Sequence, residues 1–222
     1  LATILVGVGL SAWWAPAIGT AATAVGNIIM WATDLQPFLM GIVVSVVIGI
    51  ALTLPISSAA ICAAFGLTGL AGGAAVAGCC ANMVGFAVMS FRENRWGGLV
   101  SQGLGTSMLQ MGNIVKNPRI WLPAILTSAV TGPLATCLFH FEMNDPSGGV
   151  AAGMGTCGMV GPIGVYAGWV NDVAMGVKEA VTALDWTAMA LICFILPAVL
   201  TWLFGLFFRR IGWIREGDLT LE

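Results

Sequence analysis

The chain has 222 residues, of which 59% are hydrophobic and only 8% are charged, and its mean hydropathy is +0.96. In soluble domains about a quarter of the residues are charged, so this composition excludes a soluble globular protein and predicts an integral membrane protein. The net charge is −2 and the sequence has no basic run, so we expect no nucleic-acid partner.

Charged residues divide the sequence into apolar intervals of membrane length, and about 20 apolar residues suffice to cross a bilayer. In chain order the intervals are 1–33, 35–91, 96–115, 120–141, 146–171 and 186–208. The second is long enough for two crossings. We expect it to break at LPISS (54–58), where Pro55 lacks a backbone donor and the serines can satisfy freed carbonyl groups. No segment alternates apolar and polar residues as a barrel strand does, so the predicted fold class is all-α.

Basic residues indicate which interval ends share a membrane face, because lysine and arginine mark cytoplasmic loops. Three clusters qualify: Arg92 with Arg95, Lys116 with Arg119, and the arginines of the tail 209–215. If all three are cytoplasmic, the interval between the first two clusters begins and ends on the same face. It therefore cannot be a simple crossing.

The same reasoning applies after Arg119. An outward crossing at 120–141 leads to an acidic loop, and an inward crossing at 186–208 returns to the basic tail. The interval 146–171 must then begin and end on the outer face. It also cannot be a simple crossing.

Both anomalous intervals carry a glycine motif, GLGTSMLQMGN (103–113) in the first and GMGTCGMVG (153–161) in the second. Glycine permits the turns of non-helical backbone, which membrane proteins tolerate where it is buried or lines a cavity. We therefore predict two re-entrant hairpins of opposite orientation, whose tips converge on a substrate site, as in secondary transporters. The alternative is that the glycines let helices pack closely, and we prefer this alternative for the glycine run 66–78.

These elements form one predicted transmembrane domain, a multi-span helical bundle comprising residues 1–222. In chain order it contains a helical scaffold (1–91), hairpin 1 (96–115), a span (120–141), hairpin 2 (146–171), the last span (186–208) and a cytoplasmic tail (209–222).

Polar side chains inside apolar segments are costly and tend to be functional or mutually satisfied. In this chain they are mostly neutral amides and hydroxyls, which suit a ligand that offers hydroxyl groups. A metal or proton pathway would show several buried carboxylates, so the predicted ligand is a neutral sugar or polyol. The candidate binding residues are Asn82, Thr106, Ser107, Gln110, Asn113, Asn144 and Thr156.

The remaining candidates for chemistry are few. Six cysteines lie in apolar segments without metal-ligand spacing, so we expect neither a metal site nor a cofactor. The only histidine, His140, precedes Glu142 by two residues at the outer end of a span. If this end folds into the binding cavity, the pair could orient a ligand hydroxyl and accept its proton; otherwise it is an interfacial histidine beside a solvated acid. Asp172 is a candidate for a hydrogen bond that anchors hairpin 2.

Four motifs in the same order resemble one family. They are LPISSAAI (54–61), GTSMLQMGNIVKNPRIWLP (105–123), GMGTCGMVGPIG (153–164) and GWIREGDL (212–219). Together they resemble the bacterial membrane proteins grouped as phosphotransferase-system enzyme IIC-like, including the perfringolysin-regulator-like group. The resemblance covers most of the chain from about residue 54 onward.

The resemblance implies a sugar-transport fold in the bacterial inner membrane, with a dimerising helical portion and a substrate portion built on two re-entrant hairpins. In well-understood enzyme IIC transporters, a glutamate and a histidine contact the sugar hydroxyl that a phosphocysteine on the separate IIB component phosphorylates. The matching pair in this sequence is Glu142 and His140. The implied partners are a sugar, membrane lipid, a second copy of the chain and a cytoplasmic IIB phosphocarrier. The phosphocarrier must be a separate chain, because residues 1–222 show no IIB or IIA domain.

Three functions stay open at this point. The first is a phosphotransferase-type sugar permease, and the second is a facilitator on the same scaffold without phosphorylation. The third is a membrane sensor or regulator, in which ligand occupancy shifts a two-state fold. A cytoplasmic partner would then read that shift through the loop of Lys116 and Arg119.

Overall fold

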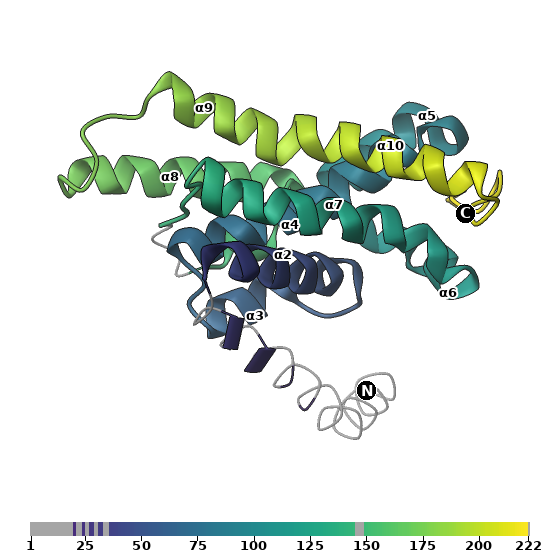
Figure 1. The fold of residues 1–222 in the computed structure, drawn as a ribbon, viewed down its shortest axis with the longest axis horizontal. Helices are drawn as coiled ribbons and strands as arrows, with labels where there is room; N and C mark the ends of the chain where they lie inside the picture. Colours follow the sequence, from purple (N-terminus) through teal and green to yellow (C-terminus); the bar gives the residue numbers. More distant parts are fainter. Residues whose placement is uncertain are drawn as a thin grey trace, which may run out of the picture.

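A computed structural model describes residues 36–144 and 149–221, together with Thr20, Ala24, Asn27, Ile28, Trp31 and Ala32 (Figure 1). Apart from these six residues, the first predicted apolar interval, 1–33, lies outside the described residues. The described part of the chain is helical, and its only strand-like feature is an isolated bridge between Gly69 and Met143. The predicted all-α membrane fold is confirmed.

The α-helices are α2 (Pro37–Thr53), α3 (Ser58–Ala64), α4 (Gly69–Met89), α5 (Phe91–Val100), α6 (Met111–Lys116), α7 (Leu122–Pro133), α8 (Val160–Ala174), α9 (Ala183–Ala190) and α10 (Leu196–Arg210). A π-helical turn, Leu191–Ile195, joins α9 to α10, and another, Leu134–Leu138, extends α7.

Three continuous helical stretches are long and apolar enough to cross a membrane: Gly69–Met89, Pro118–Leu138 and Ala183–Arg210. The last two coincide with the predicted crossings at 120–141 and 186–208. Helix α2, Pro37–Thr53, is apolar but shorter. The described parts of the intervals 96–115 and 146–171 contain no helix of crossing length.

Helices α4 and α7 form the centre of the molecule, between α2 on one side and the long helix of α9 and α10 on the other (Figure 1). Their close approach depends on glycine. A Cβ atom on Gly78 would overlap the Ser45 carbonyl oxygen of α2, and one on Gly132 of α7 would overlap the Gly41 carbonyl oxygen. The close-packing role predicted for the glycine run 66–78 is therefore confirmed at Gly78.

The predicted break in the second interval is also present. Helix α2 ends at Thr53, and Leu54 takes an extended conformation before Pro55. The Ser57 side chain then accepts a hydrogen bond of 3.2 Å from the Ala60 amide and caps α3.

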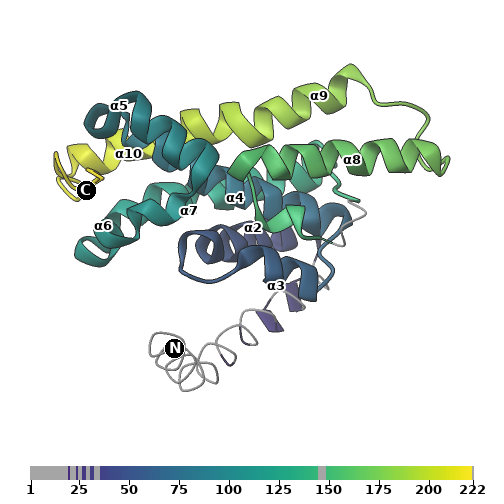
Figure 2. The ribbon, with the colours of Figure 1, turned by 180° about the vertical axis from the view of Figure 1, so that it is seen from behind.

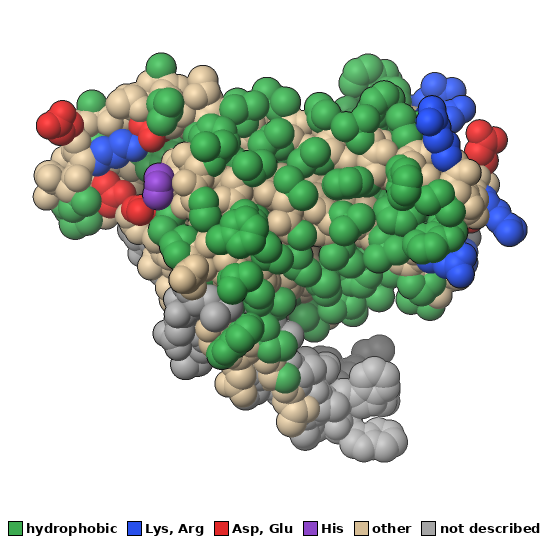
Figure 3. All heavy atoms as spheres, viewed as in Figure 1, with side chains coloured by type: hydrophobic (Ala, Val, Ile, Leu, Met, Phe, Trp, Pro, Cys, Tyr) green, Lys and Arg blue, Asp and Glu red, His purple; other side chains and the backbone are tan. Residues whose placement is uncertain are grey.

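The three basic clusters predicted to share a face lie together at one end of the molecule, which we call the basic end (Figure 3). Arg209 is 2.7 Å from Glu93, and the Arg119 guanidinium lies 5.3 Å from the centre of the Trp213 ring. Acidic side chains and the histidine gather at the opposite end (Figure 3). There Lys178 pairs with Asp185 at 2.6 Å, beside the capping box that begins α9.

Candidate functional site

The chain between α4 and α7 forms a broken helical segment, which we call segment 1 (residues 91–116). Helix α5 leads into a π-helical turn, Ser101–Gly105, and then Thr106 takes an extended conformation. The chain continues through a 3-10 turn, Ser107–Gln110, into α6. Helices α5 and α6 both lie at the end of the molecule where α10 ends (Figures 1 and 2).

A second broken segment, segment 2 (residues 149–174), consists of two short 3-10 turns and α8. Gly155, Gly158 and Met159 all have positive φ angles, which reverse the chain before α8 begins. A Cβ atom at Gly155 would meet the Cys79 backbone of α4, so only glycine permits this approach. Helix α8 runs beside α9, at the end of the molecule away from the basic end (Figure 2).

The tips of the two segments meet inside the molecule. The Thr156 hydroxyl is fully buried and donates a hydrogen bond of 2.5 Å to the Gly103 carbonyl oxygen. Both tips rest on α4, because Thr156 also lies 3.7 Å from the Met83 sulfur and the turn that contains Gly103 packs against α4, where a Cβ atom on Gly103 would lie 3.4 Å from Ala87. The two repeated glycine motifs are therefore in direct contact. That either segment re-enters from a membrane face stays a prediction.

A chain of amide side chains extends through segment 1. Gln102 donates to the Ser90 hydroxyl at 2.8 Å and accepts from Gln110 at 2.9 Å. Gln110 in turn accepts from Asn113 at 2.8 Å. Gln102 and Gln110 are fully buried, so this chain is an internal polar network rather than an open surface.

The tail of the protein completes this amide network. Gln110 donates to the Leu219 carbonyl oxygen at 3.0 Å, and Asn113 donates to the Thr220 carbonyl oxygen at 2.9 Å. Asn94 also donates to Leu219 at 2.7 Å and accepts from the Leu221 amide at 2.8 Å. The part of the predicted tail up to Leu221 is thus folded against segment 1, with the Leu219 side chain buried.

Asn82 is the centre of a second buried cluster. Its Oδ1 atom accepts hydrogen bonds from Trp121 at 3.0 Å and from Thr53 at 3.3 Å. Its Nδ2 atom donates to the Gly78 carbonyl oxygen at 3.1 Å and to the Ser128 hydroxyl at 3.2 Å. Asn82 therefore links α2, α4 and α7 through one side chain.

The two clusters are adjacent. The Ser107 hydroxyl lies 2.9 Å from that of Thr53, which joins segment 1 to the cluster around Asn82. The Thr106 hydroxyl accepts from the Met108 amide at 3.2 Å and caps the turn that follows. The structure thus groups six of the seven predicted binding residues around the tip of segment 1: Asn82, Thr106, Ser107, Gln110, Asn113 and Thr156.

Asn144 does not belong to this group. Its side chain accepts from the Gly69 amide at 3.1 Å, at the beginning of α4, and donates to Asp172 at 3.0 Å. This second hydrogen bond joins the loop before segment 2 to the end of α8. Asp172 thus makes a hydrogen bond of the predicted kind, with Asn144 as the donor, and that this bond anchors a re-entrant hairpin stays a prediction.

The structure does not bring Glu142 and His140 to the tips. Both side chains are exposed, and His140 has a φ angle of 44°. Glu142 lines an open cavity of about 600 Å³ together with residues 65–71 just before and at the start of α4. Gln102, in contrast, bonds to Ser90 at the other end of α4, and a helix of 21 residues is about 30 Å long. The catalytic role of the pair stays a prediction.

Several residues of the site were not predicted. Thr53, Trp121, Ser128 and Asn94 each supply a hydrogen bond to the network. Hydroxyl groups in apolar helices commonly bond to their own helix, as Ser128 does with the Ala124 carbonyl oxygen at 3.0 Å. The sequence positions of Thr53 and Ser128 therefore do not indicate a more distant partner. Among the described residues, no three histidine, cysteine or acidic side chains lie close enough to hold a metal ion.

These features define an all-α integral membrane protein in which two broken, glycine-rich segments meet against a central helix. The chain matches the family described as Phosphotransferase system, EIIC over residues 1–221. It belongs to that family and is a permease component of a phosphotransferase system. No curated protein and no solved structure matches the chain.

Proposed function

We propose that the protein binds a sugar where the tips of segments 1 and 2 meet, and carries it across the bacterial cytoplasmic membrane. The hydrogen bond between Thr156 and Gly103 supports this proposal most directly, because it joins two broken segments at a buried, polar position. Transporters use such interrupted helices to build a substrate site inside the membrane. The family relationship supports transport by a phosphotransferase system.

The side chains around the tips suit a ligand with many hydroxyl groups. Asn82, Gln110 and Asn113 each offer donors and acceptors, and Thr106, Ser107 and Thr156 add hydroxyls. In the structure these groups bond to one another or to the backbone. Sugar binding would exchange these internal hydrogen bonds for bonds to sugar hydroxyls, which requires Thr156 to part from Gly103.

The proposal extends to coupling with a separate IIB chain and to a homodimer. Glu142 would take the proton of the sugar hydroxyl that attacks the phosphoryl group carried by IIB, and His140 would orient that hydroxyl. Both residues lie at the other end of α4 from Gln102. This role therefore requires residues 139–144 to approach the tips during the transport cycle.

Uptake of a panel of labelled sugars into vesicles tests the function. We expect one sugar to accumulate as its phosphate only when phosphoenolpyruvate and the soluble phosphotransferase components are present. Equilibration of a sugar without the donor would show a facilitator. Absence of flux for every sugar would favour a sensor that shares this scaffold.

Replacing Thr156 with valine should slow sugar uptake on the order of tenfold. Valine keeps the shape of threonine but lacks its buried hydroxyl, so a sugar hydroxyl at this position loses its hydrogen-bond partner. An unpaired polar group of this kind costs about 1–3 kcal/mol. The initial rate of uptake at low sugar concentration measures the effect. The control is Thr187→Val, because that exposed hydroxyl bonds only within α9, to Leu184 at 2.8 Å. Equal uptake by both variants would place the sugar elsewhere.

Replacing Glu142 with glutamine should abolish formation of the sugar phosphate while leaving sugar binding intact. Glutamine has nearly the same shape, but it cannot accept the hydroxyl proton. Glu179→Gln, in an exposed loop, is the matched control. Unchanged phosphorylation in the Glu142 variant would show that this residue takes no part in the reaction, and the proposal that the sugar binds at the tips would still stand.

A further inference from the structure

Two adjacent pockets lie at the basic end, beside α4, α5 and α10 and apart from the tips of the two segments. One pocket has a volume of about 180 Å³ and is lined mainly by apolar side chains, among them Val88, Leu99, Trp202 and Leu206. The other, of about 290 Å³, is lined by five charged residues: Arg92, Glu93, Arg95, Arg209 and Glu216. Arg92 and Arg209 line both pockets, so the apolar and the charged space meet at these two arginines.

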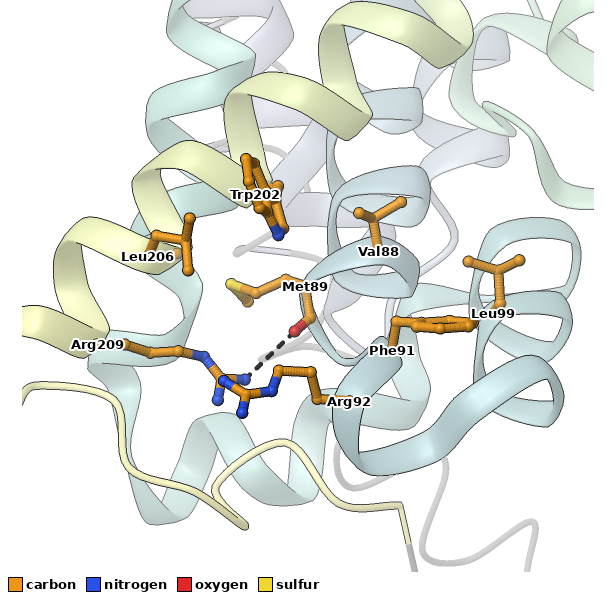
Figure 4. A pocket seen from close by; sticks show the side chains of 9 residues that line it. Val88, Met89, Phe91, Arg92, Leu99, Trp202, Leu206 and Arg209 are labelled. Carbon is orange, nitrogen blue, oxygen red and sulfur yellow. Dashed lines mark hydrogen bonds between the residues drawn. The ribbon is translucent and has the colours of Figure 1, made fainter.

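The two arginines approach each other across this boundary. Figure 4 shows the side chains of Arg92, from α5, and Arg209, from α10, extending toward one another below Trp202 and Leu206. Two guanidinium groups that face each other repel unless an anion lies between them, and guanidinium groups bind phosphate oxygens in pairs. Their geometry thus favours a phosphate group.

Arg209 is held in position from two sides. It donates to the Glu93 carboxylate at 2.7 Å and to the Met89 carbonyl oxygen at 3.3 Å, and its side chain is only 14% exposed. Glu93 is also buried, and its second carboxylate oxygen has no hydrogen-bond partner among the described residues. Glu93 therefore fixes the direction of the Arg209 guanidinium.

Arg92 and Arg95 are not fixed in this way. Arg92 lies 3.6 Å from Glu216, and both of these side chains are largely exposed, so this ion pair contributes little. Arg95 is exposed and has no ion pair among the described residues, and its φ angle is 53°. In the charged pocket three guanidinium groups outnumber two carboxylates, which leaves positive charge for a ligand.

The apolar pocket extends from the arginines along the middle of α10. Trp202, Leu206 and Arg209 occupy successive turns on one face of this helix. Gly205 lies between them, and a Cβ atom there would come within 3.0 Å of the Met89 side chain. The pocket thus offers an apolar channel whose polar end carries two arginines, at the end of a membrane-length helix.

We propose that these pockets bind one phospholipid with an anionic headgroup. Its phosphodiester lies between Arg92 and Arg209, its headgroup occupies the charged pocket, and one acyl chain follows the apolar pocket beside Trp202 and Leu206. A soluble phosphate would leave the apolar part empty, whereas a lipid fills both. Basic pockets between helices at the cytoplasmic membrane surface recognise lipid headgroups in this way.

Native mass spectrometry of the full chain with added phosphatidylglycerol or phosphatidylcholine tests the proposal. We expect phosphatidylglycerol to bind more tightly than phosphatidylcholine. The double variant Arg92→Gln, Arg95→Gln should weaken its binding roughly thirtyfold, since each arginine near a membrane surface contributes about 1 kcal/mol. The matched control is Arg210→Gln, Arg215→Gln, which removes the same charge from residues that do not line either pocket.

Four outcomes would overturn the lipid site. Equal losses in both double variants would indicate a general effect of surface charge. Equal binding of phosphatidylglycerol and phosphatidylcholine would show that the charge of the headgroup does not determine binding. Full competition by glycerol phosphate would identify a soluble phosphate as the ligand. Unchanged lipid binding together with weaker phosphorylation by the soluble components would assign the arginines to a protein partner.

A second variant tests the lipid site independently, in case the arginine double variant does not fold. Leu206→Trp should fill the apolar pocket while leaving all the arginines in place. We expect it to reduce retention of phosphatidylglycerol but not of glycerol phosphate. Unchanged lipid retention in this variant would also contradict the proposal.

Discussion

Replacing Gly78 with alanine is expected to lower the free energy of unfolding by about 3 kcal/mol, a typical upper value for overpacking a tight core. The added Cβ atom would overlap the carbonyl oxygen of Ser45 on α2. Backbone cannot rotate away as a side chain can, so α2 and α4 must separate. The Gly78 carbonyl oxygen also accepts hydrogen bonds from Asn82 and Ser128, which the separation would disturb. Thermal unfolding of the purified protein in detergent measures the change.

Gly112→Ala is the matched control for this variant. Gly112 lies within α6, and a Cβ atom there would have no heavy atom within 4 Å. Alanine is the better helix former by about 1 kcal/mol, so this variant should be neutral or slightly more stable. Equal destabilisation of both variants would show that chain flexibility at glycine, and not helix contact, is what matters.

The sequence allowed prediction of those features that depend on residues close together in the chain. Pro55 has no amide hydrogen, and its position alone predicted the break after α2. The basic residues at 92, 95, 116 and 119 marked both ends of segment 1, and α5 and α6 do lie at the same end of the molecule (Figures 1 and 2). The repeated glycine motif indicated the tips, and Thr156 in the second motif does contact Gly103 in the first.

The partners of the polar residues could not be predicted, because they are distant in sequence. Gln110 and Asn113 bond to carbonyl groups at Leu219 and Thr220, more than a hundred residues later. Every residue has a carbonyl group, so no residue type in the tail marks it as an acceptor. From the sequence we predicted that these two amides bind a sugar, whereas in the folded chain they already donate hydrogen bonds to backbone carbonyl groups.

The position of Glu142 depends on another feature that the sequence does not reveal. The adjacent Met143 pairs with the backbone of Gly69 through hydrogen bonds of 2.9 and 3.0 Å. This pairing holds the loop beside the beginning of α4. Backbone pairing of two single residues leaves no pattern in the side chains. The hypothesis that Glu142 and His140 face the binding site rested on their closeness at the end of a span and on the family resemblance, and neither of these determines where the loop packs.

Replacing Asn82 with alanine is expected to destabilise the protein by about 2–3 kcal/mol. The amide holds four partners, and the Trp121 indole can only donate, so without Asn82 this partly buried donor loses its acceptor. Asn171→Ala is the control, since Asn171 lies in α8 and makes no side-chain hydrogen bond within the described residues. Unfolding in detergent should show a large shift for the first variant and little for the second.

A double variant identifies the source of this destabilisation. Trp121→Phe removes the indole donor that Asn82→Ala would leave unsatisfied, so the two changes together should destabilise less than the sum of the single changes. The expected difference is about 1 kcal/mol, the low end of the penalty for an unpaired donor, because Trp121 is only partly buried. Simple additivity would mean that water or another group replaces the Asn82 oxygen. Because Asn82 is fully buried and joins α2, α4 and α7 beside Ser107, the same coupling would also set how rigidly the tip of segment 1 is held.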